Sequence, residues 1–335
     1  MNVIVLREPG HLVMDTRPDP VPDTGEVVLR IRRIGVCGTD LHAYGGDQPY
    51  FHYPRVLGHE LCGELMEPFG AAKKGELFSI IPYRHCGSCN ACRSGKTNCC
   101  RKLSVIGVHE DGGMAEFIAV RKDLLVPGNG LSSDELAIVE PFAIGAHAIR
   151  RAGLTGGETV MVVGAGPIGH GIIRQLMAIG VDPILLERSP VRLEMARRID
   201  GLRVMDANDP DLKDELLSLF AGEGADVIFE ATGNLSAIEQ MPVHLAHGGK
   251  MILVGLQQDS FRFSHPEFHR REATLMSSRN ATREDFIRVM EQLSSGRLKA
   301  EMLINSHASF NTVPAVFPSW TGSDSPTLKA VIDLN

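Results

Sequence analysis

Residues 158–180, ETVMVVGAGPIGHGIIRQLMAIG, contain the pattern that is most informative about the fold class of this chain. An apolar run ends in a Gly-x-Gly-x-x-Gly turn and an amphipathic segment follows, which predicts a strand, a tight turn and a helix. The first glycine permits the turn, the second lets backbone approach a pyrophosphate, and the third lets helix and strand pack closely. We therefore predict a dinucleotide site at Gly164, Gly166, Pro167, Ile168 and Gly169.

The alternation of apolar strands with helices continues beyond this turn, which predicts an α/β fold with a doubly wound parallel sheet. Further strands fit PILLE at 183–187, ADVIFEATG at 225–233, KMILVGL at 250–256 and ATLMSS at 273–278. Helices fit Pro190 to Ile199 and Arg283 to Ser295. From residue 1 to about 130, short alternating apolar runs broken by Pro and Gly predict mostly antiparallel β-structure. We expect a dinucleotide-binding domain over 149–284, and a catalytic domain of residues 1–148 and 285–335 that includes the last strand, TLKAVIDL.

Glu187 ends the strand after the glycine turn and follows Gly169 by 18 residues. A carboxylate there can accept hydrogen bonds from a ribose diol and repels a 2′-phosphate, so NAD is favoured over NADP. Arg188 has two interpretations, an exposed arginine at a turn or a group that recognises phosphate.

Five of the seven cysteines lie between Cys86 and Cys100. Their C-x2-C-x2-C-x7-C spacing can enclose a tetrahedral zinc with no open position, which is typical of a structural site. The ligands would be Cys86, Cys89, Cys92 and Cys100. Spacing alone leaves Cys99 as an alternative to Cys100, and an iron–sulfur cluster as an alternative to zinc.

A second zinc site is predicted from residues far apart in the sequence. Cys37 lies in GVCGTDLH, His59 and Glu60 lie in LGHELCG, and Glu140 lies in VEPFAIGAH. A thiolate, an imidazole and one or two carboxylates from distant loops suit a catalytic zinc that keeps a place for water or substrate.

Composition excludes several classes of partner. The chain has 34 basic and 41 acidic residues, a net charge of −7, and no basic tract that would bind a phosphate backbone, so we expect no nucleic-acid partner. The longest uncharged apolar stretch, between Glu158 and Arg174, is too short to cross a bilayer. The N-terminus lacks the features of an export signal, and clustered cysteines fit a reducing compartment. We therefore expect a cytoplasmic protein without a membrane partner.

Several segments together resemble the zinc-containing medium-chain alcohol dehydrogenases, especially the sorbitol and threonine dehydrogenase branch. They are CGTDLH at 37–42, GHELCG at 58–63, the cysteine cluster, EPFAIGAHA at 140–148 and VVGAGPIG at 162–169. The resemblance covers nearly the whole chain. It implies a GroES-like, mostly β catalytic domain and a Rossmann domain, two zinc ions per subunit, NAD, and a homodimer or homotetramer.

The resemblance also implies roles for individual residues. Cys37 and His59 would be catalytic zinc ligands, with Glu60 a ligand or near neighbour and Glu140 in the region where other members use a second Cys. Cys100 rather than Cys99 would be the fourth structural ligand. Thr39 would pass the proton of the alcohol through the cofactor ribose to His42. Further cofactor contacts would come from Arg192, Val254, Gly255, Leu256, Ser278 and Arg279.

Longer stretches resemble a subgroup that oxidises sugar acids, the L-galactonate and L-gulonate 5-dehydrogenases. They are QPYFHYPRVLGHE at 48–60, SGKTNCCRKLSVIGVHEDGG at 94–113 and HPEFHRREATLMSSRNAT at 265–282. The expected reaction is hydride transfer to NAD from the secondary alcohol at carbon 5 of a sugar acid. Polyols such as sorbitol or L-idonate-like compounds, and L-threonine, are alternative substrates. Arg84, His109 and Arg279 are the candidates for binding a substrate carboxylate.

A rival from another class is a non-enzymatic protein whose cysteine cluster binds a macromolecule and whose nucleotide fold senses redox state. The acidic net charge and the separate Cys37, His59 and Glu60 set argue against it. A protein that binds NADH but oxidises no polyol or sugar acid would support it.

Overall fold

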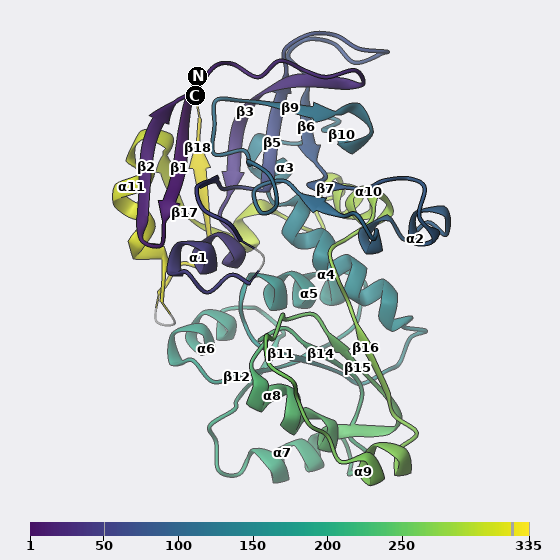
Figure 1. The fold of residues 1–335 in the computed structure, drawn as a ribbon. Coiled ribbons are helices and arrows are strands. Elements are labelled where there is room, and N and C mark those ends of the chain that lie inside the picture. The colour runs from purple at the N-terminus through teal and green to yellow at the C-terminus, as the bar shows by residue number, and fades with distance from the viewer. Residues whose placement is uncertain (50, 323–324, 335) are drawn as a thin grey trace. The chain divides into compact units, whose positions relative to one another are not determined.

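The computed structural model describes residues 1–49, 51–322 and 325–334, which form two compact units (Figure 1). Unit 1 comprises Met1–Ala143 and Asn280–Asn335, and unit 2 comprises Ile144–Arg279. Each boundary lies five residues before the one expected, 143 against 148 and 279 against 284. The chain therefore enters unit 2 within a helix rather than in a linker.

Unit 2 is built on a six-stranded parallel sheet of order β13-β12-β11-β14-β15-β16 (Figure 1). Its strands are β11 (Val160–Val163), β12 (Ile184–Glu187), β13 (Arg203–Asp206), β14 (Ala225–Glu230), β15 (Leu245–Leu253) and β16 (Thr274–Ser277). Its helices are α5 (Pro167–Ala178), α6 (Pro190–Arg197), α7 (Leu212–Leu219), α8 (Leu235–Gln240) and α9 (His265–Arg270). The strand order reverses at β11, which confirms the expected doubly wound sheet.

Alternate residues of the central strands enter two separate apolar cores. Val160 and Val162 of β11 belong to one core, and Met161 and Val163 belong to the other. Since successive side chains of a strand point to opposite faces, both faces of this sheet are buried. This burial explains why the strands read as continuous apolar runs rather than as alternating ones.

Unit 1 contains a seven-stranded sheet with the path β10-β6-β5-β3-β18-β17, in which β9 also pairs with β3. Its strands are β3 (Glu26–Gly35), β5 (Glu60–Leu65), β6 (Leu77–Ile80), β9 (Phe117–Arg121), β10 (Leu125–Pro127), β17 (Ile304–Ser309) and β18 (Lys329–Asp333). Smaller sheets are formed by β1 (Asn2–Glu8), β2 (His11–Thr16) and β4 (Arg55–Val56), and by β7 (Tyr83–Arg84) and β8 (Ser104–Val105). As expected, most pairs are antiparallel and the last strand, β18, returns to pair with β3.

Among the described residues of unit 1, the helices are short except for α4 and α10. They are α1 (Gly38–Gly45), α2 (Asn90–Arg93), α3 (Ser133–Ala137), α10 (Arg283–Ser294) and α11 (Val313–Val316), together with the start of α4 (Val139–Ala152). Among the described residues, no helix of either unit is both long and apolar enough to cross a membrane.

Candidate functional site

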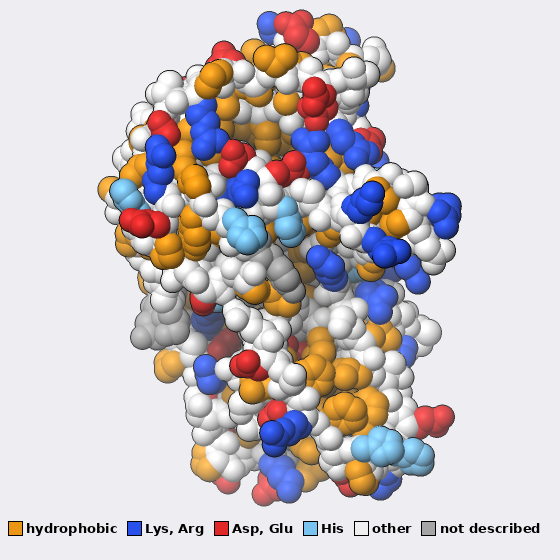
Figure 2. Space-filling view, in the orientation of Figure 1, with side chains coloured by type: hydrophobic (Ala, Val, Ile, Leu, Met, Phe, Trp, Pro, Cys, Tyr) orange, Lys and Arg blue, Asp and Glu red, His pale blue; other side chains and the backbone are white. Residues whose placement is uncertain are grey.

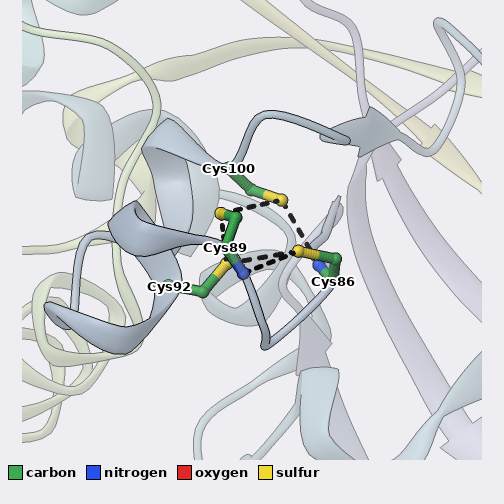
Figure 3. Close-up of side chains that lie close together, drawn as sticks. All are labelled: Cys86, Cys89, Cys92 and Cys100. Carbon is green, nitrogen blue, oxygen red and sulfur yellow. Dashed lines mark hydrogen bonds between the residues drawn. The ribbon is translucent and has the colours of Figure 1, made fainter.

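Four of the five cysteines in the cysteine loop, residues 86–100, point toward one another: Cys86, Cys89, Cys92 and Cys100 (Figure 3). The sulfur of Cys92 lies 4.0 Å from the sulfur of Cys86 and 3.5 Å from the sulfur of Cys89. The sulfurs of Cys89 and Cys100 are 4.0 Å apart. A tetrahedral zinc with Zn–S bonds of about 2.3 Å requires S–S separations of about 3.8 Å. The sulfurs are therefore spaced for a single zinc ion, whereas a cluster of several irons would hold them further apart.

Backbone N–H groups support these sulfurs. Cys86 and Lys102 both donate to the Cys100 sulfur at 3.3 Å, and Cys89 donates to the Cys86 sulfur at 3.3 Å. Such hydrogen bonds favour thiolates, and those from Ser88 and Cys89 lower the pKa of Cys86 to about 5. Cys99 is exposed and lies outside the group that the other four form.

Exposed basic side chains surround the cysteine loop. Figure 2 shows Lys and Arg gathered over the lobe that carries α2, where Arg93, Lys96, Arg101 and Lys102 are exposed. The positive charge of the lobe contrasts with the net charge of −7 for the chain.

Cys37, His59 and Glu60 converge in unit 1, with one ligand atom of each within 4.8 Å of the others. Cys37 precedes α1, while His59 immediately precedes β5 and Glu60 is its first residue. The expectation that loops carry all of these groups is wrong for Glu60, in a strand, and for Glu140, in helix α4. Residues 139–143 are all buried and, apart from Glu140, all apolar, so the start of α4 is apolar on every side.

Asp40 links the segments that carry Cys37 and His59. Its fully buried carboxylate accepts hydrogen bonds from the N–H of Cys37, at 2.9 Å, and of Gly58, at 3.2 Å. The first of these closes a capping box at the start of α1. His59 Nδ1 lies 3.8 Å from Asp40 Oδ1 and has no hydrogen-bond partner among the described residues.

Glu60 forms a buried ion pair with Lys329 of β18. Lys329 Nζ lies 2.6 Å and 2.8 Å from the two carboxylate oxygens and donates to the Val36 carbonyl at 3.0 Å. Burial disfavours the charged lysine, but Glu60 and Cys37 outweigh that effect and raise its pKa. Sequence reasoning missed Lys329, because no motif marks a lysine within a C-terminal strand.

Glu140 lies outside the group of Cys37, His59 and Glu60, and its Oε1 accepts a hydrogen bond from the buried hydroxyl of Tyr83. Burial raises the pKa of Glu140, and burial together with Glu140 raises that of Tyr83 well above its usual value. Tyr83 was also missed, since a tyrosine in a short strand carries no ligand signal.

Acidic groups outnumber basic ones at this site. The acids are Cys37, Asp40, Glu60 and Glu140, and the bases are His59 and Lys329. Burial alone would lower the pKa of His59, yet Cys37 and Asp40 hold it well above its usual value. Because uncompensated buried charge costs several kcal/mol per ion, a divalent cation held by Cys37, His59 and Glu60 would be stabilised here.

The predicted relay residues lie on α1. Thr39 is half-buried, and the exposed His42 has Nδ1 3.0 Å from Asp47 Oδ2. Of the candidates for a substrate carboxylate, Arg84 is already paired with Glu26 at 2.8 Å and Glu110 at 2.9 Å.

His109 Nδ1 accepts the Val105 N–H at 3.1 Å. Arg279 is the last residue of unit 2, so the structure does not bring the three carboxylate candidates together within one unit.

The glycine turn of unit 2 has the tight geometry expected. Gly164 has φ of +98°. A Cβ on Gly169 would lie 1.8 Å from the Gly164 carbonyl oxygen, and one on Gly166 would lie 2.9 Å from Arg192 Nη1. Arg192, predicted only from the resemblance, therefore lies beside the turn.

Glu187 is buried and its carboxylate is held by backbone. Oε2 accepts the Ala165 N–H at 2.6 Å, while Oε1 accepts those of Arg188 and Ser189 at 2.7 Å and 2.8 Å. Each carboxylate oxygen has two acceptor sites, so Oε2 can still accept from a ribose hydroxyl. The Arg188 side chain is exposed.

The remaining predicted cofactor residues follow β15 and β16. Val254 and Gly255 both donate N–H to the Glu230 carbonyl, Leu256 is exposed, and Ser278 donates its N–H to Leu253. A Cβ on Gly255 would lie 2.1 Å from the Gly233 nitrogen. Residues 231–233, the end of the segment ADVIFEATG, therefore lie against the predicted cofactor segment at 254–256. The sequence did not predict them as part of the cofactor site.

Two protein families match the chain: the alcohol dehydrogenase GroES-like domain over residues 23–130 and the zinc-binding dehydrogenases over residues 167–295. The chain is 41% identical to L-galactonate-5-dehydrogenase of Escherichia coli K12, over 99% of this chain and 98% of the relative. It is 30% identical to sorbitol dehydrogenase of Bacillus subtilis 168, over 76% and 75%. Among solved structures, RspB from Escherichia coli CFT073, an alcohol dehydrogenase complexed with NADH, matches with a TM-score of 0.92 and 28% identity over 100% of this chain and 99% of that one.

Proposed function

The chain belongs to the zinc-binding dehydrogenases, as its sequence motifs indicated, and we propose that it oxidises the secondary alcohol at carbon 5 of a sugar acid with NAD. The L-galactonate and L-gulonate class is the proposed substrate. The observation that carries this proposal is the 41% identity to an L-galactonate-5-dehydrogenase over 99% of the chain, against 30% to a sorbitol dehydrogenase.

Cys37, His59 and Glu60 would hold the catalytic zinc, with Glu140 beside it. A zinc ion held there would supply a Lewis acid that favours deprotonation of the substrate alcohol near neutral pH. Asp40 fixes the start of α1 and thereby Cys37, and Lys329 offsets the charge of Glu60. Thr39 and His42 would carry the released proton outward, and the exposure of His42 gives that proton access to water.

The cofactor would occupy the glycine turn of unit 2. Gly164, Gly166 and Gly169 would approach the pyrophosphate, and Glu187 would accept from the ribose diol. Arg192 lies beside Gly166 and would contact the same part of the cofactor. The segments at 254–256 and 278–279 would complete the site.

The cysteine loop would bind a second, structural zinc through Cys86, Cys89, Cys92 and Cys100. Its sulfur spacing and N–H donors support this, as does the absence of a disulfide among these cysteines. Because the site needs reduced thiols, we also propose a cytoplasmic location. We propose further that the cysteine loop supports the contacts between subunits of a homodimer or homotetramer.

A neutral polyol is the second candidate substrate. It is favoured by the pairing of Arg84 with two carboxylates, which removes one of the cations that could have bound a sugar acid.

The test of the proposed function is NADH formation by the zinc-loaded protein with L-galactonate, L-gulonate, L-idonate, sorbitol and L-threonine. We expect turnover to be concentrated on the hexonates. Activity confined to sorbitol or threonine would overturn the sugar-acid assignment. Cys37→Ser should abolish turnover and remove one of two zinc ions, while Cys99→Ser, which changes an exposed cysteine outside both groups, should change neither. If Cys37→Ser keeps its activity, the catalytic assignment is wrong.

A further inference from the structure

His170 is a buried histidine directly behind the glycine turn. It lies in the first turn of α5, and only 3% of the residue is exposed. Its Nδ1 is 3.0 Å from the Ala165 carbonyl oxygen and 3.3 Å from that of Gly166. Since both neighbours are acceptors, Nδ1 carries the proton. Burial lowers the pKa of His170 to about 4, so the ring is neutral near pH 7.

The hydrogen bond to Ala165 determines where the next N–H group points. In a trans peptide the C=O and N–H bonds point in opposite directions. Because the Ala165 carbonyl is held toward buried His170, the N–H of Gly166 is directed away from it. Among the described residues no acceptor pairs with that N–H group.

The preceding peptide is fixed as well. The N–H of Ala165 donates to Glu187 Oε2 at 2.6 Å, so the peptides on both sides of Ala165 have a single orientation. Free N–H groups at the start of a helix bind phosphate well, provided that they are already aimed at it. Residue 170 follows the last glycine of the Gly-x-Gly-x-x-Gly pattern and is not part of it.

We propose that His170 is a positioning residue for the cofactor: it holds the Ala165 carbonyl inward so that the Gly166 N–H is presented to the pyrophosphate. This inference rests on the proposed use of NAD. His170 does not touch the cofactor in this role, and it takes no part in hydride or proton transfer.

The experiment compares His170→Leu, His170→Asn and His170→Gln by titration with NADH, followed by the fluorescence of the bound nucleotide. The Asn amide can place a donor near the position of Nδ1, whereas Leu has no donor and the longer Gln places its amide elsewhere. A lost hydrogen bond to a charged group corresponds to roughly 10- to 100-fold in affinity. We expect Leu and Gln to raise the Kd for NADH by about that factor and Asn to remain within about threefold of the wild type.

The Kd is read together with zinc content, melting temperature and kcat at saturating NAD. The proposal expects a raised KM for NAD, with zinc content and kcat unchanged. If His170→Leu does not fold, the comparison of the Kd for NADH between His170→Gln and His170→Asn tests the proposal. Wild-type affinity in a folded Leu or Gln variant would overturn the proposal, as would an Asn variant as weak as they are. A wild-type protein that does not bind NADH at all would overturn the proposed cofactor and this inference with it.

Discussion

Replacing Lys329 with methionine should destabilise unit 1 by about 3–5 kcal/mol, because it leaves a buried carboxylate without its partner. The Lys329 and Glu60 side chains are 1% and 0% exposed. Methionine fills most of the space of the lysine stem, so the main loss is of charge rather than of packing. A bound zinc ion would offset part of the cost, so the metal-free protein should lose more than the zinc-loaded protein.

The assay is urea unfolding followed by tryptophan fluorescence. The chain has a single tryptophan, Trp320, which is buried in unit 1 and donates to Ser306 of β17, the neighbour of β18. Its signal therefore reports unit 1 rather than unit 2. For an m-value of about 2–3 kcal/mol per M, the loss moves the urea midpoint down by about 1–2.5 M.

Two control variants sharpen this test. Arg7→Met removes one partner of the exposed pair between Arg7 and Asp15, at 2.6 Å, and should cost less than about 1 kcal/mol. Adding Glu60→Gln to Lys329→Met removes the unpaired charge and should recover at least half of the lost stability. A midpoint shift for Lys329→Met no larger than that for Arg7→Met would show that the buried pair of Lys329 and Glu60 does not stabilise unit 1 more than an exposed pair does.

Three other predictions concern the glycine turn and the cysteine loop. The pKa of His170, about 4 in the folded chain against 6.5, means that only the unfolded state binds a proton between these values. Stability should therefore fall as pH drops from 6.5 toward 4, by up to about 3 kcal/mol, and circular dichroism melts should show a shallower pH slope for His170→Asn; equal slopes would contradict this. Glu187→Ser should weaken NADH binding and shift the NAD:NADP ratio of kcat/KM toward NADP, since it removes the acceptor for the diol; an unchanged ratio would count against the assignment. Cys92→Ala should lose one zinc per chain and elute later on gel filtration while it retains turnover, and an unchanged elution volume would argue against a role of the cysteine loop in assembly.

The fold could be predicted largely from local patterns. The strand, glycine turn and helix at 158–180 depend on residues that are close in sequence, and both faces of the resulting sheet are covered, so its strands are continuous apolar runs. Some strands gave no such signal. β17, for example, alternates half-buried and exposed residues and lacks a strong apolar run, so only its pairing with β18 identifies it as a strand.

Groups whose members are neighbours along the chain could be predicted from the sequence alone. The cysteine loop and the glycine turn are examples, because short spacing fixes which atoms can meet whatever the rest of the molecule does. The surroundings of Glu60 and Glu140 depend instead on contacts between residues far apart in the sequence. Lys329 reaches Glu60 across 269 positions and Tyr83 reaches Glu140 across 57. These contacts exist because β18 pairs with β3 and because α4 packs its first turn into unit 1. Burial makes each of these contacts important for stability, because a charged or polar group removed from water destabilises the fold unless another group of the protein pairs with it.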